Sequence, residues 1–493
     1  MLRTTLVLLL ACLLTSIACA AGPADGDTTT PIKHVVVIFQ ENNSFDHYFG
    51  TYPRALNPVG EPPFTPAAGT PAVNGLTPML LTRNPNSTQP FRLDRSMEIT
   101  CDNDNHYSDE QSAYHGGLLD KFPESTSATG TGCTPALVMG YYDGNTVTGL
   151  WNYAQHFALS DNFFDTEFGT TVMGHLNLIS GQTHTTSVTT IKGKVANGSV
   201  IANVEAGVDD CVTTANGTPV TMTGMNVGDL LNAKGVSWGW FYGDFVQSTN
   251  NQPIPFASCG TAYNSHYDPF QYYQTTSNQH HLPPSSISAI GTSADQANHQ
   301  YALTDFWNAV NNGNFPAVVF LKATSSETGH PANSSPLQEQ QFLVTTINAL
   351  MKTPEWSSMA ILITYDDSDG WYDHVMPPII SPSNDAANDT LLGSSGMCGT
   401  PVSGAYLDRC GYGTRLPFLV ISPYAKSNYV SHALTDTSSL LRFIEDNWDL
   451  GRIGDQSFDA LAGSILDSFD FTSTTRTKRV LLDPTSGQVT KGK

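Results

Sequence analysis

The sequence is short of basic residues. Its 493 residues include 22 lysines and arginines against 44 aspartates and glutamates, which makes the formal net charge −22. Nucleic acids are polyanions, so a chain without a basic patch has nothing to offset their repulsion, and the composition argues against such a partner. A phosphorylated small molecule would meet the same repulsion unless its site held a metal ion or protonated histidines.

Long apolar runs are missing beyond the N-terminus, where no stretch reaches the roughly 20 apolar residues of a membrane helix. A positive start at residues 1–3, an apolar run over 6–14 and the small residues Ala18-Cys19-Ala20 are typical of an export signal. We therefore expect residues 1–20 to be a signal peptide and the protein to be secreted or periplasmic. A retained anchor helix and a lipid anchor on Cys19 stay as alternatives, although Ser16 stands where lipidated sites usually carry leucine.

Closely spaced CxxC pairs are absent too. Removal of the leader leaves six cysteines, and an even number in an exported chain indicates disulfides rather than a metal site. Pairing of neighbours along the chain predicts the bonds Cys101–Cys133, Cys211–Cys259 and Cys398–Cys410. Sequence alone leaves other connectivities open.

Short apolar runs rich in β-branched residues recur along the chain, at 35–39, 236–242, 317–322, 360–365 and 417–422. Helix-like segments lie between them, at 304–311, 338–350 and 437–448. Fully apolar strands that alternate with helices predict an α/β fold with a mostly parallel central sheet and helices on both faces.

Residues 21–493 are expected to form a single domain. The regions 53–90 and 193–298 are rich in Gly, Pro, Asn, Ser and Thr, which favour loops. We interpret 193–298 as an insertion packed around the core.

Polar residues follow two of the predicted strands directly. Glu41 and Asn42 come after the first strand, and Asp366 and Asp367 come after the run at 360–365. Ligands of parallel α/β sheets bind beyond the carboxyl ends of strands, and adjacent carboxylates there repel each other unless a cation is bound. A solvated acidic turn is the alternative for either cluster alone.

A third motif starts at Gly169-Thr170-Thr171 and continues in a helix-like pattern. It predicts a hydroxyl group at a helix start, where backbone N–H groups favour an incoming phosphate. A threonine that only caps the helix is the alternative.

These motifs resemble those of the bacterial phosphoesterase family that contains phospholipases C and acid phosphatases. The resemblance is carried by residues 41–50, 365–375 and 419–425, and it extends over about 32–483. It implies an alkaline-phosphatase-like core. The nucleophile is often serine flanked by prolines in acid phosphatases of this family, whereas this chain has Thr170-Thr171-Val172-Met173.

The resemblance also implies roles for individual residues. The metal ligands are expected to be Glu41, Asn42, Asp366 and Asp367, and the nucleophile Thr171. The histidines around the bound phosphate are expected to be His106, His281 with His280 beside it, and His330.

The residue types define the expected chemistry. Four oxygen ligands with three negative charges suit a divalent ion of the Mg²⁺, Ca²⁺ or Mn²⁺ class. Histidines with ordinary pKa values of about 6.5 are cationic in mildly acidic medium, where they can offset phosphate charge and protonate a leaving oxygen.

The leading functional hypothesis is an acid phosphatase that cleaves small phosphomonoesters through a phospho-threonine intermediate. The segment Asp366-Asp367-Ser368-Asp369-Gly370-Trp371 and the absence of Pro-Asn-Arg after the nucleophile resemble that branch of the family. The alternatives are a phospholipase C acting on a phospholipid headgroup and a non-catalytic binding protein on the same scaffold. The sequence does not indicate the oligomeric state.

Overall fold

The structure, a computed structural model, describes residues 26–128, 130–215, 217–472 and 478–490. The predicted signal peptide, with Cys19, lies outside these residues.

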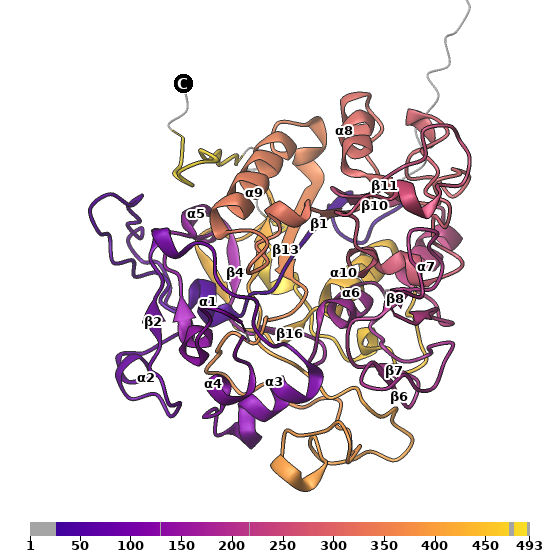
Figure 1. Ribbon diagram of the computed structural model, residues 1–493. Coiled ribbons are helices and arrows are strands. Elements are labelled where there is room, and N and C mark those ends of the chain that lie inside the picture. The colour runs from indigo at the N-terminus through magenta and orange to yellow at the C-terminus, as the bar shows by residue number, and fades with distance from the viewer. Residues whose placement is uncertain (1–25, 129, 216, 473–477, 491–493) are drawn as a thin grey trace, which may run out of the picture.

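An eight-stranded sheet runs through the middle of the molecule (Figure 1). In spatial order its strands are β11 (Gln300–Ala302), β10 (Trp238–Tyr242), β12 (Val318–Lys322), β1 (His34–Gln40), β13 (Met359–Tyr365), β14 (Phe418–Ile421), β4 (Ala158–Ser160) and β15 (Tyr429–Ser431). Among these strands only β14 runs antiparallel to its neighbours. The sheet is therefore mostly parallel, as predicted.

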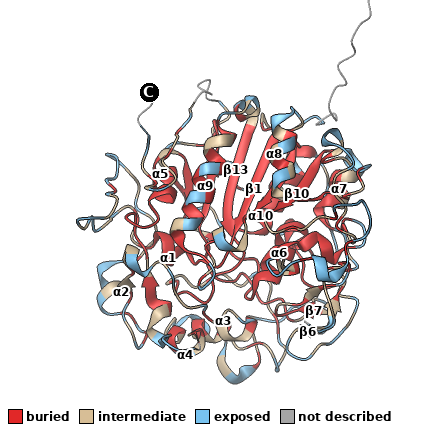
Figure 2. Cartoon of the chain, turned by 45° about the horizontal axis from the view of Figure 1, so that its top comes forward, coloured by how far each residue is buried: buried red, intermediate tan, exposed pale blue. Residues whose placement is uncertain are grey.

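The described helices are α1 (Phe45–Phe49), α2 (Pro78–Thr82), α3 (Tyr107–Tyr114), α4 (Phe122–Ser125), α5 (Thr148–His156), α6 (Thr171–Ser180), α7 (Val227–Lys234), α8 (Leu303–Asn311), α9 (Pro336–Leu350) and α10 (Ser438–Trp448). Figures 1 and 2 show α5 and α9 on one side of β1 and β13, and α6 and α10 on the other. Helices on both faces bury β1 and β13 along their whole length, which explains why these strands are apolar. The predicted α/β class is confirmed.

Two-stranded ribbons lie around this core: β2 (Phe91–Arg92) with β3 (Gly140–Tyr141), β5 (Phe163–Phe164) with β16 (Thr435–Asp436), β6 (Val195–Ala196) with β7 (Ser199–Val200), and β8 (Glu205–Ala206) with β9 (Pro219–Val220). Four of these eight strands, β6, β7, β8 and β9, lie within 193–298, together with α7 and β10. This region therefore contributes β10 to the central sheet, while most of its remainder is turns and loops.

The strand register brings distant residues to one edge of the sheet. Gln40 at the end of β1 lies opposite Tyr365 at the end of β13, so the residues that follow them, Glu41 and Asp366, leave the sheet side by side. On the other side of β1, Ile38 lies opposite Leu321 of β12. The next residue of β12, Lys322, is therefore level with Phe39 and close to the same edge.

The three predicted disulfides are present: Cys101–Cys133, Cys211–Cys259 and Cys398–Cys410. The bonds span 32, 48 and 12 residues along the chain, so each closes a local loop. The pairing of neighbours along the chain is confirmed.

Candidate active site

The two acidic motifs are joined by backbone hydrogen bonds at the carboxyl edge of the sheet. The N–H of Asn42 donates to Asp366 Oδ1 at 2.9 Å, and the N–H of Asn43 donates to the carbonyl oxygen of Asp367 at 2.9 Å. Asn42 has a φ of +60°, a left-handed conformation that asparagine tolerates better than most residues. The structure thus brings the four predicted metal ligands into one pair of adjoining loops.

Several acceptor atoms in these loops are buried without a hydrogen-bond partner, namely Glu41 Oε2, Asn42 Oδ1 and Asp366 Oδ2. Buried polar atoms are nearly always paired, so a group of unpaired acceptors calls for a ligand that supplies positive charge. A divalent metal ion coordinated by oxygen fits this requirement. The residues present therefore fit the metal that the family resemblance implies.

His175 of α6 adds a nitrogen atom to this group. Its Nδ1–H donates to the carbonyl oxygen of Thr171 at 2.8 Å, so Nε2 carries the lone pair, and that atom is buried and unpaired. One ligand atom each from His175, Glu41 and Asp366 lie within 4.8 Å of one another. Burial, with the nearby Lys322 ammonium, lowers the pKa of His175 well below its ordinary value, so the ring is neutral. His175 is thus a further candidate metal ligand.

The carboxylates of the site repel one another. Burial raises the pKa of Glu41 well above its ordinary value, and the neighbouring Asp366 raises it further. Burial also raises the pKa of Asp367, and Asp366 and Glu110 add to that shift. A bound cation would relieve this repulsion and keep the carboxylates ionised.

Thr171 is the first residue of α6, and its hydroxyl oxygen lies 3.5 Å from Asp367 Oδ2. Thr170 occupies the N-cap position, but its side chain makes no capping hydrogen bond and its Oγ1 is buried without a partner. Of the two adjacent threonines, Thr171 is therefore the one with a contact to the predicted metal ligands.

Two glycines allow α6 to approach the acidic loop. Gly169 has a φ of +135°, and a Cβ atom there would lie 2.4 Å from Met173 Sδ. A Cβ atom on Gly174 would lie 1.9 Å from the carbonyl oxygen of Asp366. A larger residue at 174 would therefore push the helix that carries Thr171 away from Asp366.

Glu110 of α3 connects the nucleophile turn with the acidic loop, and the sequence contained no signal for it. It accepts hydrogen bonds from the N–H of Gly169, at 3.0 Å, and from the hydroxyl of Ser368. Burial raises the pKa of Glu110 to about 8, although both hydrogen bonds act in the opposite direction. A periodic pattern in α3 does not reveal this role because both partners are far away in sequence.

A network of buried ion pairs holds the motifs at 41–50 and 365–375 together, further from Thr171. Arg415, which is completely buried, bonds to Asp46 Oδ1 at 3.1 Å and to Asp373 Oδ2 at 3.0 Å. His374 Nδ1 lies 2.6 Å from the second oxygen of Asp46. His374 therefore braces the two motifs through Asp46.

His106 is located beside the acidic loop. It is the N-cap residue of α3, and the N–H of Asn103, three residues earlier, donates to Asp369 Oδ2 at 3.0 Å. The imidazole is largely exposed and bonds to Asp104. The hydrogen bond that the ring donates to the Asp104 carboxylate raises the pKa of His106, although partial burial opposes it.

His330 lies on a segment that contacts the first acidic motif. The carbonyl oxygen of Thr328 accepts the N–H of Glu41 at 3.1 Å, which fixes the chain two residues before His330. The ring itself donates from Nδ1 to the carbonyl oxygen of Pro331 at 2.6 Å. His330 is therefore near the site, with Nε2 as its remaining ring nitrogen.

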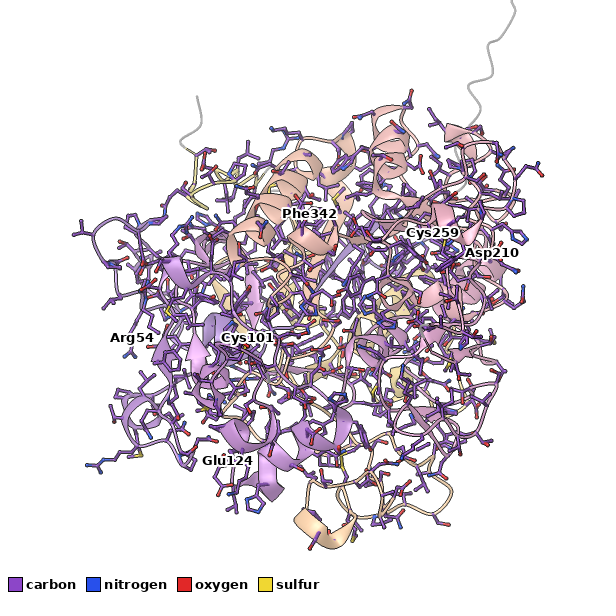
Figure 3. All side chains as sticks on the ribbon, in the orientation of Figure 1. Arg54, Cys101, Glu124, Asp210, Cys259 and Phe342 are labelled. Carbon is purple, nitrogen blue, oxygen red and sulfur yellow. A yellow bond between two sulfur atoms is a disulfide. The ribbon has the colours of Figure 1, made fainter. Side chains whose placement is uncertain are left out.

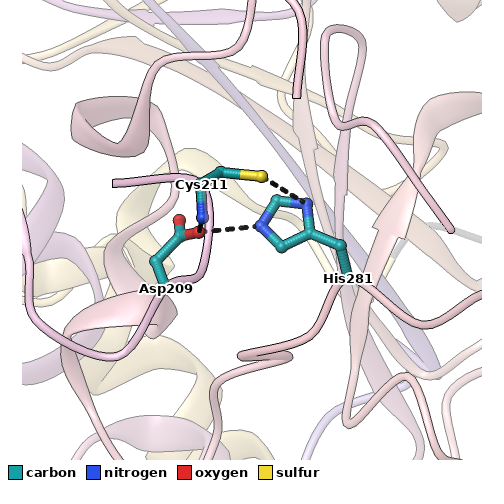
Figure 4. Close-up of side chains that lie close together, drawn as sticks. All are labelled: Asp209, Cys211 and His281. Atoms are coloured by element: carbon teal, nitrogen blue, oxygen red, sulfur yellow. Dashed lines mark hydrogen bonds and ion pairs between the residues drawn. The ribbon is translucent and has the colours of Figure 1, made fainter. Parts of the chain in front are cut away.

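His280 and His281 have partners of their own elsewhere. Both ring nitrogens of the buried His281 are engaged. Nε2 bonds to Asp209 at 2.9 Å (Figure 4), and Nδ1 donates to the carbonyl oxygen of Val246 at 2.7 Å. His280 pairs with Asp210, which lies toward one edge of the molecule near Cys259 (Figure 3). The structure gives no contact between either ring and the acidic loops, and their role around phosphate stays a prediction.

Lys322 is the cation that the sequence analysis missed. It is completely buried and its ammonium group bonds to Glu41 Oε1. A lysine at the end of an apolar strand is usually the first solvated residue, which is why the sequence did not single it out. A lysine therefore offsets part of the negative charge at this site.

The fold and the site define an α/β protein with a hydroxyl group and a cluster of carboxylates at the carboxyl edge of a mostly parallel sheet. The model of the Phosphoesterase family matches residues 32–451, and the chain belongs to that family. This finding confirms the family resemblance carried by the motifs.

Curated relatives of the chain include several phospholipases C. Non-hemolytic phospholipase C of Burkholderia pseudomallei is 26% identical over 86% of this chain and 56% of its own length. Phospholipase C A of Mycobacterium tuberculosis is 25% identical over 96% of this chain and 84% of its own. Non-specific phospholipase C3 of Arabidopsis thaliana is 24% identical over 83% of this chain and 66% of its own. The chain thus spans little more than half of the Burkholderia relative.

Solved structures with some similarity include a protein of the alkaline phosphatase superfamily from Vibrio parahaemolyticus. It is 10% identical with a TM-score of 0.33, over 87% of this chain and 69% of that chain. Murine ectonucleotide pyrophosphatase/phosphodiesterase 5 is 12% identical with a TM-score of 0.32, over 66% of this chain and 95% of that chain. Within the described residues, no helix combines the length and the apolar character needed to cross a membrane.

Proposed function

We propose that this protein is a metal-dependent phosphoester hydrolase with Thr171 as its nucleophile. The observation that carries the proposal is the position of the Thr171 hydroxyl, 3.5 Å from Asp367 Oδ2 and beside the unpaired oxygens of Glu41, Asn42 and Asp366. Membership of the Phosphoesterase family supports the same reaction class.

Glu41, Asn42, Asp366 and Asp367 would hold the metal ion, with His175 as an additional ligand. When bound, such an ion stabilises negative charge on phosphate oxygens and lowers the pKa of a coordinated hydroxyl group. The closest acceptor for the hydroxyl proton of Thr171 is Asp367 Oδ2.

The reaction is a double displacement at phosphorus. Thr171 Oγ1 forms a bond to phosphorus as the ester P–O bond breaks, and the leaving oxygen takes up a proton. Water then breaks the threonine–phosphorus bond, which restores the hydroxyl and releases the phosphorylated product. Of the histidines predicted to surround the phosphate, His106 and His330 lie on segments that contact the acidic loops, and a protonated His106 is our candidate for the proton donor.

The substrate class has two candidates. The names of the curated relatives favour a phospholipid, from which the enzyme would release a phosphorylated headgroup. The segment from Asp366 to Trp371 resembles the acid phosphatase branch and favours a small phosphomonoester. Both substrates present the same phosphate group to Thr171, so the proposed chemistry serves either one. A non-catalytic binding role is the remaining alternative, and it conflicts with the reactive groups gathered at the site.

Export is part of the proposal. The leader-like residues 1–20 and the three disulfides both fit an oxidising compartment outside the cytoplasm.

The test compares hydrolysis of p-nitrophenyl phosphate with hydrolysis of a phosphatidylcholine dispersion, across pH and with added Mg²⁺, Ca²⁺ or Mn²⁺. Cleavage of the monoester alone identifies a phosphatase, and cleavage of the lipid identifies a phospholipase C. Thr171→Ala is the control for contaminating activity. If the wild-type protein cleaves neither substrate although it binds phosphate, the binding-protein alternative replaces this proposal.

A further inference from the structure

Lys322 lies in an unusual position for a lysine. It ends β12 in the middle of the sheet, and its side chain is completely buried. Its ammonium group is 4.7 Å from the centre of the Tyr267 ring and 5.6 Å from that of Phe39. Aromatic faces attract a cation, but they do not replace the hydrogen bonds that an ammonium group loses when it leaves water.

The charged partner of Lys322 is Glu41, one of the predicted metal ligands. The ammonium group bonds to Glu41 Oε1, and the other oxygen, Oε2, is buried and unpaired. Lys322 therefore occupies one oxygen of this carboxylate and leaves the other oxygen for a second cation. A buried charge that lacked this partner would cost several kcal/mol, so the pair is strongly coupled.

Lys322 also affects the sum of charges around the metal ion. Glu41, Asp366 and Asp367 contribute three negative charges when ionised, and a divalent ion supplies two positive charges. Lys322 supplies the third. These three carboxylates, the ion and Lys322 would then carry no net charge between them, so they would not repel an incoming phosphate, although the protein as a whole carries a charge of −22.

We propose that Lys322 is a positioning residue that sets the charge balance of the metal site. It weakens the hold on the metal ion by competing for the carboxylate of Glu41, and it offsets negative charge that would otherwise repel the phosphate. The inference rests on the proposed function, because it assumes that Glu41 and Asp366 bind a divalent ion.

A purely structural counterion would behave differently. Removal of such a lysine would disturb the loops around Glu41, so metal binding and phosphate binding would both weaken. The charge-balance role predicts changes of opposite sign. Without the competing ammonium group the site would bind the metal ion more tightly, whereas its net charge of −1 would repel phosphate.

The experiment uses Lys322→Met, which keeps the length of the side chain and removes its charge. Titration calorimetry on protein stripped with EDTA measures the affinity for Mn²⁺ alone, and a second titration with inorganic phosphate follows on the metal-loaded protein. We expect Mn²⁺ affinity to rise and phosphate affinity to fall, each by at least about tenfold, because unit charges a few ångströms apart are only weakly screened in a buried site. Lys322→Arg keeps the charge and is expected to change both affinities less.

Lys322→Gln, whose amide can still donate to Glu41, provides the same comparison if the methionine variant does not fold. Weakening of both affinities, or no change in either, would overturn the inference. Failure of the proposed function gives a different result. In that case wild-type protein would not bind Mn²⁺ at the site, and Glu41→Gln would leave any measured Mn²⁺ affinity unchanged.

Discussion

The hydroxyl oxygen of Thr171 lies 3.5 Å from Asp367 Oδ2, although 196 residues separate the two in the chain. The proximity depends on Gly174, which lets α6 lie directly against the carbonyl oxygen of Asp366. It also depends on Glu110, which bonds to the turn before Thr171 and to Ser368 beside Asp367. These contacts hold Thr171 and the loop that contains Asp366 and Asp367 in a fixed relative position.

The first prediction concerns the two adjacent threonines. Thr171→Ala should lower kcat on the order of a thousandfold or more, because the attacking oxygen is lost. Thr171→Ser should keep measurable turnover, since it retains a hydroxyl group. Thr170→Ala is the matched control, and it should retain most of the activity. Steady-state kinetics measure kcat for each variant. An inactive Thr170→Ala variant together with an active Thr171→Ala variant would refute the assignment of Thr171 as the nucleophile.

The second prediction concerns the metal. Treatment with EDTA should abolish turnover, and a divalent ion should restore it. Asp366→Asn should weaken binding of that ion by at least about 10–100-fold, because even loss of an outer-shell contact has an effect of that size. Asp449→Asn removes a carboxylate that is 88% exposed and should leave the affinity unchanged. Equal affinities in the two variants, measured by calorimetry, would place the ion elsewhere.

The third prediction concerns pH. A hydrogen bond donated to the Asp104 carboxylate raises the pKa of His106, so the ring stays protonated to a higher pH than an ordinary histidine. If protonated His106 donates the proton to the leaving group, activity falls as pH rises through this pKa. Asp104→Asn should lower the pKa of His106 and move the alkaline limb of the kcat/KM profile to lower pH. An unchanged alkaline limb would exclude His106 as the donor.

The fourth prediction concerns the packing of α6. Gly174→Ala places a Cβ atom where the carbonyl oxygen of Asp366 now lies, so the helix and the acidic loop have to separate. We expect a loss of about 1–3 kcal/mol in the free energy of unfolding and a weaker metal affinity. Gly149→Ala in α5 is the control, because its new Cβ would meet the flexible side chain of Gln340. Denaturant unfolding and metal titration test both effects, and a fully stable Gly174→Ala variant with normal metal affinity would contradict the packing.

Much of the central sheet was predictable from short apolar runs. The run at 35–39 corresponds to β1, and the run at 360–365 to β13, because both strands are covered by helices on two faces and carry apolar residues throughout. The short strands β4 and β15 have three residues each, too few for a recognisable pattern. The antiparallel direction of β14 is set by long-range packing, and an apolar run carries no direction.

The acidic residues of the site were predictable because they follow strands whose ends must share an edge of the sheet. His175, Lys322 and Glu110 were not, for a common physical reason. Each acts with a partner that the fold supplies from another element: Glu41 for His175 and for Lys322, and Gly169 for Glu110. Such contacts depend on register and on helix packing, which the local sequence does not encode.

The covalent intermediate on Thr171 is the central claim, and its direct detection is the most decisive measurement. Wild-type protein would be mixed with substrate, quenched in acid within the first turnover and digested, and its peptides analysed by mass spectrometry. We predict one added phosphoryl group, or a phosphorylated headgroup if the substrate is a lipid, on Thr171 of the peptide that contains Gly169 and Thr170. The same experiment on Thr171→Ala should give no modified peptide. Full activity with an unmodified Thr171 throughout the first turnover, or modification of Thr170 instead, would contradict the account.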